Sequence, residues 1–305
     1  MSVLNRSWLF VPGSRPDRFD KALAAGADQV IVDLEDAVAP SDKSSSRAAL
    51  AAWLDAPGPA VVVRINGAQT EWFKDDLALL TLPRVSQVIL PKTESADEVA
   101  ATIAGFGQRS SARGASGSGG SGDQNGARRE SGASTRPVIA LIESALGMAN
   151  LRLLCAAPGL SRLAFGTIDF QADLGMRGAT EEDLAPWRLE ILLQSRLATI
   201  AAPLDGVSTA IDDAATLAID IARARRLGYA GKLCIHPKQV AATNQGFAST
   251  PTEIAWAKRV IAAADAAGGG AVAVDGKMVD RPVLLRAQAV LDEQPSVTGA
   301  QTPAQ

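Results

Sequence analysis

Two stretches, Val138-Ile-Ala-Leu-Ile-Glu143 and Leu163-Ala-Phe-Gly-Thr-Ile-Asp169, say most about how this chain folds. In each one a short, continuously apolar run is followed closely by a carboxylate. Runs of this kind are typical of parallel strands that are buried on both faces. We therefore expect Glu143 and Asp169 to project from the ends of two such strands.

The same layout occurs twice earlier in the chain. The run 30–32 reaches Asp33 and continues into Glu35 and Asp36, and the run 61–63 leads into Arg64. Because the carboxyl ends of the strands in a parallel barrel meet at one face, these charged side chains are expected to gather there. Carboxylate oxygens are the protein ligands that Mg²⁺ prefers, so the pattern favours a magnesium-dependent barrel enzyme.

Short β-branched runs alternate along the chain with longer segments that place apolar residues three and four positions apart. Eight strand–helix units over this length predict a (β/α)8 TIM barrel. The alternative is a doubly wound open sheet, which would carry a glycine-rich phosphate loop after its first strand, and residues 11–16 lack that motif. The expected strands are 8–11, 29–33, 60–65, 87–90, 138–142, 162–165, 203–206 and 232–235, and the expected helices are 17–25, 43–53, 72–80, 97–106, 148–157, 181–201 and 212–227.

Two segments depart from the alternating pattern. Residues 108–136 are rich in Gly, Ser and Arg, and we expect a disordered insertion within a catalytic barrel domain that spans residues 1–267. Beyond the helix expected at 251–267, a triple glycine precedes a hairpin that turns at Asp275-Gly276 and a helix that ends near Leu291. A short hairpin is not stable alone, so residues 268–291 are predicted to form a lid over the barrel mouth, followed by a flexible tail at 292–305.

Composition excludes several classes of protein. The net charge of −3 gives no reason to expect a nucleic-acid partner, and no apolar run approaches the length of a membrane span. The N-terminus lacks a secretory pattern, so we expect a cytoplasmic protein with Cys155 and Cys234 as buried thiols. His236 is the one histidine, which excludes histidine-rich zinc sites.

Eight motifs occur along the chain in a specific order, although each alone is weak. They are Leu9-Phe-Val-Pro-Gly13, Val32-Asp-Leu-Glu-Asp-Ala-Val38, Val63-Arg-Ile-Asn66, Leu90-Pro-Lys92, Ile142-Glu-Ser-Ala145, Phe165-Gly166 with Asp169 and Asp173-Leu-Gly175, Cys234-Ile-His-Pro237, and Gly276-Lys-Met-Val-Asp-Arg-Pro282. From Arg6 to about Leu291, apart from the insertion, the chain resembles the citrate lyase β-subunit-like proteins of the HpcH/HpaI aldolase superfamily.

The resemblance implies a Mg²⁺-dependent carbon–carbon lyase, commonly a homotrimer. Such an enzyme cleaves or condenses a short 3-hydroxyacyl-CoA thioester, such as citramalyl-CoA or malyl-CoA, with acetyl-CoA and an α-keto acid as products. The resemblance also implies that Glu143 and Asp169 ligate the metal, that Glu35 and Asp36 hold metal-bound waters, and that Arg64 grips the substrate.

Two further groups of residues take their expected roles from the same resemblance. Phe10, Lys21, Ile235 and His236 are expected to contact coenzyme A. Asp280 is expected to be the catalytic acid/base, delivered by the lid of a neighbouring protomer. A carboxyl group that is shielded from water by a closed lid suits proton exchange with the acetyl methyl group.

A purely structural role is the alternative for several of these residues. Glu143 would otherwise be a capping or salt-bridging residue, and Asp169 or Asp280 ordinary helix-cap or turn residues. Lys92 is either an anion contact or a satisfied ion pair, and Asp173 either caps a helix or supports the metal loop.

Two other functions compete with the lyase. One is an acyl-CoA thioesterase on the same scaffold. The other is the β subunit of a multi-subunit citrate lyase, which acts on an acyl-carrier-protein thioester and requires α and γ partners.

Overall fold

The computed structural model describes residues 5–107, 137–267 and 272–293. These residues form two compact units, one up to Gly246 and the other from Phe247 onward. The predicted insertion at 108–136 and the tail from 294 onward lie outside the described residues. No helix within the described ranges is long and apolar enough to cross a membrane.

Eight parallel strands close into a barrel in chain order, and β1 pairs with both β2 and β8. This closure confirms the predicted TIM barrel and rules out the open sheet. The apolar runs became strands because both of their faces are covered, one by the barrel interior and the other by helices. The strands are β1 (Ser7–Pro12), β2 (Gln29–Asp33), β3 (Val61–Arg64), β4 (Val85–Leu90), β5 (Val138–Ile142), β6 (Leu160–Phe165), β7 (Ala201–Asp205) and β8 (Gly231–Cys234).

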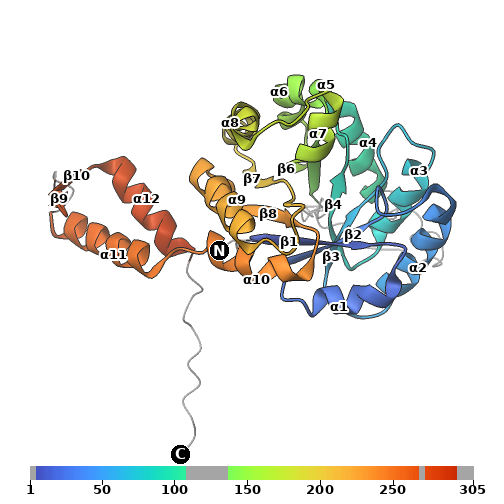
Figure 1. Cartoon of the computed structure of the whole chain (residues 1–305), viewed down its shortest axis with the longest axis horizontal. Coiled ribbons are helices and arrows are strands. Elements are labelled where there is room, and N and C mark those ends of the chain that lie inside the picture. Colours follow the sequence, from blue (N-terminus) through green and yellow to red (C-terminus); the bar gives the residue numbers. More distant parts are fainter. Residues whose placement is uncertain (1–4, 108–136, 268–271, 294–305) are drawn as a thin grey trace, which may run out of the picture. The chain divides into compact units, whose positions relative to one another are not determined.

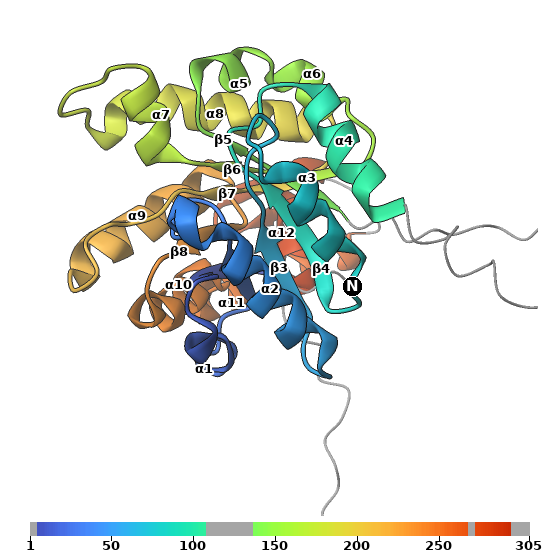
Figure 2. The same ribbon diagram turned by 90° about the vertical axis from the view of Figure 1, so that its right-hand side faces the viewer.

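Helices surround the barrel, and α2, α3 and α4 lie outside strands β3 and β4 (Figure 2). The helices of this unit are α1 (Phe19–Leu23), α2 (Lys43–Asp55), α3 (Phe73–Asp76), α4 (Ala96–Gly107), α5 (Ala145–Ala149), α6 (Leu151–Cys155), α7 (Thr167–Asp173), α8 (Glu181–Leu197), α9 (Ala214–Leu227) and α10 (Val240–Phe247). Short 3-10 helices occur at Pro16–Arg18, Pro40–Asp42, Leu77–Thr81 and Pro237–Gln239.

Several predicted helices differ from those observed. The helix expected at 148–157 is two short helices, because Asn150 leaves the helical conformation and its side chain donates to the Glu94 carbonyl at 2.8 Å. The segment expected at 72–80 forms α3 and then a 3-10 turn. Helices α7 and α10 are not among the helices assigned from periodicity, because seven or eight residues are too few to show a helical period.

The barrel interior is filled by apolar side chains from all eight strands. Trp8, Ile31, Val62, Ile89, Ile139, Leu141, Ala164, Leu204 and Leu233 form one cluster, and each is at most 2% exposed. Phe10 and Val207 are partly buried and pack on this cluster. The barrel interior is therefore packed with side chains, and these side chains form the bottom of a site at the carboxyl ends of the strands.

The second unit has a small core of its own. It consists of α11 (Pro251–Ala266), the hairpin strands β9 (Val272–Val274) and β10 (Lys277–Val279), and α12 (Arg281–Asp292). Figure 1 shows α11 and α12 side by side with the hairpin at one end of the pair. Asp275 and Gly276 both have positive φ, 52° and 73°, as a tight hairpin turn requires.

The helix–hairpin–helix order of this unit matches the expectation from the sequence. Its boundary lies before α11, earlier than the expected boundary at residue 267. The physical reason is that α11 contributes Ala257 and Val260 to the core that it shares with Val279 and Ala287. That this unit serves as a lid stays a prediction.

Candidate active site

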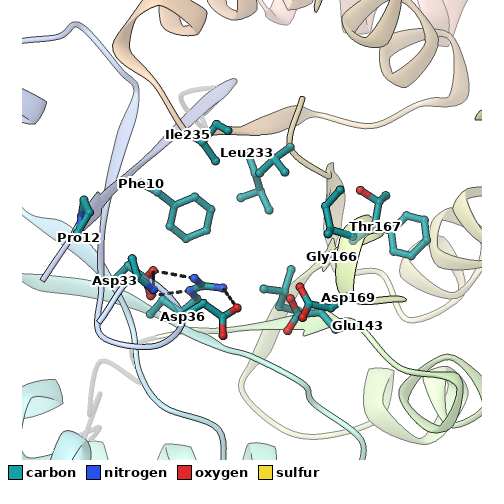
Figure 3. Close-up of a pocket in the computed structure, with 16 residues that line it drawn as sticks. Phe10, Pro12, Asp33, Asp36, Glu143, Gly166, Thr167, Asp169, Leu233 and Ile235 are labelled. Carbon is teal, nitrogen blue, oxygen red and sulfur yellow. Dashed lines mark hydrogen bonds and ion pairs between the residues drawn. The ribbon is translucent and has the colours of Figure 1, made fainter. Parts of the chain in front are cut away.

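A cavity of about 430 Å³ opens at the carboxyl ends of the strands. Its wall is divided between polar and apolar groups. In Figure 3, Asp33, Asp36, Glu143 and Asp169 lie along one side, with Phe10, Leu233 and Ile235 across the opening. The lining residues are Phe10, Pro12, Asp33, Asp36, Ala37, Arg64, Leu141, Glu143, Phe165, Gly166, Thr167, Ile168, Asp169, Val207, Leu233 and Ile235.

Arg64, the last residue of β3, is held in place by carboxylates from the end of β2. Its Nε and Nη2 donate to the two oxygens of Asp33, each at 2.7 Å, and its Nη1 lies 2.9 Å from Glu35. The guanidinium also covers the ring of Phe10, with 4.8 Å between Cζ and the ring centroid. Burial lowers the pKa of Arg64, but the Asp33 and Glu35 charges more than offset this and raise it above its ordinary value. Arg64 is therefore a rigid cation in the cavity wall.

Glu143 follows β5 and is 4% exposed. Its Oε2 accepts a hydrogen bond from the backbone N–H of Lys92 at 2.8 Å. Burial raises the pKa of Glu143 to about 8; Arg64 opposes this shift, and the charge of Glu35 adds to it. An adjacent cation would favour the charged form of this carboxyl group.

A glycine makes room for this carboxylate. A Cβ on Gly166 would lie 2.3 Å from Cγ and 2.5 Å from Oε1 of Glu143, which is closer than real side chains approach. Gly166 ends the turn between β6 and α7, and it lets the carboxylate of Glu143 lie against the backbone of that turn.

Asp169 lies in the first turn of α7, and its side chain is 41% exposed. The same helix is tied to the end of β5, because Asp173 accepts a hydrogen bond from the backbone N–H of Ala145 at 2.7 Å. Asp173 thus supports the loop that carries Glu143, one of the two roles left open for it. The structure brings Glu143 and Asp169, which are 26 positions apart in sequence, to one wall of the same cavity.

Glu35 and Asp36 extend this acidic wall beyond the end of β2. Glu35 is buried between two cations, with Arg64 at 2.9 Å and the Lys92 ammonium at 2.5 Å, and burial raises its pKa. Asp36 is half-exposed, and its oxygens lie 3.8 Å from Arg64 and 3.5 Å from Lys92. The buried ammonium of Lys43 anchors the loop by donating to the carbonyls of Leu34 and Glu35 at 2.7 and 2.6 Å.

The donor set of this wall suits a hard cation. Glu143 and Asp169 could supply one carboxylate each, and the remaining ligands would be water or substrate oxygens. No group of three or more His, Cys, Asp or Glu side chains in the described ranges could hold a metal ion alone.

A second depression of about 440 Å³ lies beside the first, and Phe10, Pro12 and Ile235 line both. It brings together the four residues that were expected to contact coenzyme A: Phe10, Lys21, Ile235 and His236. Arg15 and Arg18 add positive charge, although Arg15 is paired with Asp17 at 2.9 Å. His236 Nδ1 accepts from the N–H of Lys238 at 3.2 Å, which gives this side chain a structural role at a helix start.

Comparison with known proteins identifies the family. The family model for HpcH/HpaI aldolase/citrate lyase matches residues 6–237 of this chain. The chain belongs to the HpcH/HpaI aldolase/citrate lyase family. Membership of this family makes the protein an enzyme of the lyase class.

The chain is similar to members of this family over nearly its whole length. The citrate lyase subunit beta-like protein of Deinococcus radiodurans is 35% identical, covering 96% of this chain and 98% of the relative. The L-malyl-CoA/beta-methylmalyl-CoA lyase of Cereibacter sphaeroides is 33% identical, covering 94% and 93%. The crystal structure of CitE from Mycobacterium tuberculosis in complex with magnesium, acetoacetate and coenzyme A is 33% identical, with a TM-score of 0.76 and coverage of 95% and 98%.

One residue with an expected role lies outside the barrel. Asp280 belongs to the second unit, where its side chain caps α12 by accepting from the N–H of Val283 at 3.2 Å. Its part in the chemistry of this HpcH/HpaI family member stays a prediction.

Sequence reasoning assigned no role in the site to two of its contributors. Asp33 is the bidentate partner of Arg64, and Gly166 provides the space for Glu143. Asp33 had a usable signal, because it is the acidic last residue of an apolar strand. Gly166 had only its place in a loop, and the atom that it must avoid comes from another strand.

Proposed function

We propose that this HpcH/HpaI family member is a Mg²⁺-dependent lyase that cleaves or condenses a short 3-hydroxyacyl-CoA thioester. Citramalyl-CoA and malyl-CoA are the expected substrates, with acetyl-CoA and an α-keto acid as products. The observation that carries this proposal is the convergence of Glu143, Asp169 and Arg64 on one cavity at the strand ends. The names of the related malyl-CoA lyase and of the CitE complex with magnesium and coenzyme A support it.

The residues present fit Mg²⁺. This ion keeps several waters and usually takes one or two protein carboxylates, which corresponds to Glu143 and Asp169 as ligands with Glu35 and Asp36 holding the waters. The space that Gly166 leaves beside Glu143 is filled by the carboxylate and not by a side chain of the turn. When bound, Mg²⁺ would polarise the carbonyl oxygen of the keto acid and fix its position.

Arg64 would bind the oxygen on which negative charge develops. Asp33 accepts from two of its five N–H donors, and Nη1 forms an ion pair with Glu35, so N–H donors remain for a substrate carboxylate or for the thioester oxygen. Because those carboxylates fix the guanidinium beforehand, little reorganisation is needed as the enolate forms.

In the cleavage direction, the carbinol hydroxyl group loses its proton to water and becomes the keto carbonyl. The bond between the α-carbon of the acetyl unit and the carbinol carbon breaks at the same time, and its electron pair becomes the acetyl-CoA enolate. Asp280 would donate a proton to that carbon, and in the condensation direction it would remove one. We propose that a homotrimer forms and that the second unit of one protomer brings Asp280 to the cavity of its neighbour. Coenzyme A would lie in the second depression, beside Phe10, Lys21, Ile235 and His236.

A panel of short 3-hydroxyacyl-CoA esters, incubated with and without Mg²⁺ and followed by mass spectrometry, tests the reaction. Glu143→Gln and Asp169→Asn should each lower turnover at least 100-fold and weaken Mg²⁺ binding, because each removes a charged ligand. The matched control is Asp75→Asn, an acid with a 70% exposed side chain, which should keep full turnover. Full activity of either site variant would refute the lyase.

Product analysis distinguishes the alternatives. Acetyl-CoA together with a keto acid supports the proposed cleavage. Free CoA together with an intact hydroxy acid indicates a thioesterase. Turnover only of an acyl-carrier-protein thioester, and only with added partner subunits, indicates a citrate lyase β subunit.

A further inference from the structure

Lys92 connects the separate parts of the acidic wall. It follows β4 by two positions, and its backbone N–H holds Glu143 at 2.8 Å. Its ammonium lies 2.5 Å from Glu35 and 3.5 Å from Asp36, at the end of β2. The same ammonium lies 3.9 Å from Asp169, on α7.

The backbone of Lys92 is adapted to this position. Its φ of 48° is left-handed, a conformation that is unfavourable for residues with a Cβ and that persists only where the surroundings impose it. In this conformation the residue presents its N–H to Glu143 on one strand and its side chain to the acids of two other elements. A simple surface ion pair would not require such a backbone.

The charge balance of the wall depends on this lysine. Among the described residues, the ion pairs of Asp33, Glu35, Asp36 and Asp169 are formed with Arg64 and Lys92, and the Lys43 ammonium adds a third positive charge at the end of β2. Arg64 is engaged by Asp33 and Glu35, deep in the cavity. Within the described part of the chain, Lys92 is the one cation whose charged nitrogen lies within 4.0 Å of Asp169.

We propose that Lys92 is a positioning residue that limits metal affinity, because its ammonium competes with the divalent cation for Asp169 and Glu35. This inference rests on the proposed function, which assigns the cation to Glu143 and Asp169. An ammonium beside a divalent ion repels it, and without the ion it relieves the repulsion among the carboxylates. Both effects favour release of the ion.

The test is the dissociation constant of Mg²⁺, measured by isothermal titration calorimetry on the full chain. Lys92→Gln keeps the backbone N–H but removes the ammonium, and it should bind Mg²⁺ on the order of tenfold more tightly at low ionic strength. Lys92→Arg keeps the charge and should bind Mg²⁺ like the wild type. Unchanged or weaker binding by Lys92→Gln would overturn the proposal, since a purely structural lysine could not tighten binding when it is removed.

A second variant covers the case in which Lys92→Gln does not fold. Lys92→Gly also lacks the ammonium and tolerates the left-handed backbone, and it should show the same tightening. Failure of this inference is distinguishable from failure of the proposed function. If the wild type binds no Mg²⁺, the metal site itself is wrong; if Glu143→Gln abolishes binding while neither neutral variant tightens it, only the role of Lys92 is wrong.

Discussion

The buried carboxylate of Glu143 can occupy its position because Gly166, which lies against it, has no side chain. It accepts one backbone hydrogen bond, from Lys92, and its Cγ occupies the space that a Cβ on Gly166 would need. Burial makes this carboxyl group costly to ionise, and the charge of Arg64 offsets only part of that cost, which is why its pKa is raised to about 8. The glycine therefore belongs to the site as much as the acid does.

We predict that Gly166→Ala weakens Mg²⁺ binding at least roughly tenfold, because the new methyl group must push Glu143 out of the cavity wall. Titration calorimetry measures the loss. Gly67→Ala is the matched control, since its nearest contact would be the Pro91 carbonyl at 3.8 Å, and it should bind Mg²⁺ normally. Equal affinity for the two variants would contradict the role of Gly166.

The two thiols should be unreactive in the native protein. Burial raises the pKa of Cys155 to about 11 and also raises the pKa of Cys234, so little thiolate exists at pH 8. We predict slow reaction with an aromatic disulfide reagent at pH 8, and release of two equivalents of chromophore after unfolding in urea. Rapid release from the native protein would show that a thiol is accessible.

At the scale of elements, α8 is joined to the end of β7 by buried charges. Arg188, with a 2% exposed side chain, donates to Asp205 at 2.8 Å, and Asp205 is fully buried. The next cations are Arg223, whose Nη2 lies 3.8 Å from Asp205, and Lys232, whose ammonium lies 4.0 Å from it. The Arg188–Asp205 pair therefore fixes α8 against the end of β7.

We predict that Arg188→Met lowers the free energy of unfolding by about 3–5 kcal/mol, because Asp205 would keep a buried charge without its main partner. Urea unfolding measures this loss. The double variant Arg188→Met with Asp205→Asn should recover part of it, since no carboxylate is then left unpaired. The exposed pair Arg15–Asp17 is the control, and Arg15→Met should leave the unfolding midpoint unchanged.

At the scale of the whole molecule, the described residues form two units, and each unit has an apolar core of its own. The barrel closes through the pairing of β1 with β8, and the second unit packs around its own apolar residues. We predict that a chain ending at Ser249 folds cooperatively, as measured by circular dichroism during thermal unfolding, and has lost turnover because Asp280 is missing. Substantial turnover by this shortened chain would show that Asp280 is not the catalytic acid/base.

Exchange of the second unit between protomers can be tested by complementation. Glu143→Gln and Asp280→Asn should each be inactive alone. If Asp280 serves the cavity of a neighbour, co-expression of the two variants should restore roughly a quarter of wild-type turnover, because that share of sites receives both intact residues. A mixture that stays inactive, although mixed oligomers are shown to form, would place Asp280 over its own barrel.

The alternation of apolar runs with helical periods was enough to predict the barrel, because each strand is buried on both faces and each helix on one. It also predicted that Glu143, Asp169 and Arg64 would share one face, since all parallel strands point the same way. The short helices α5, α6 and α7 were harder to predict from the sequence. They depend on contacts such as the hydrogen bond from the Asn150 side chain to a carbonyl more than 50 residues away.

The precise contacts of the site came only with closure of the barrel. The acids that bind Arg64 and the carboxylates that Lys92 reaches are 28 to 77 positions away from these cations in sequence. The need for a glycine at position 166 is set by Glu143, which follows a different strand. Local propensity carries no information about such pairs. Their partners are chosen by the register of eight strands, and a single chain shows that register only once it has folded.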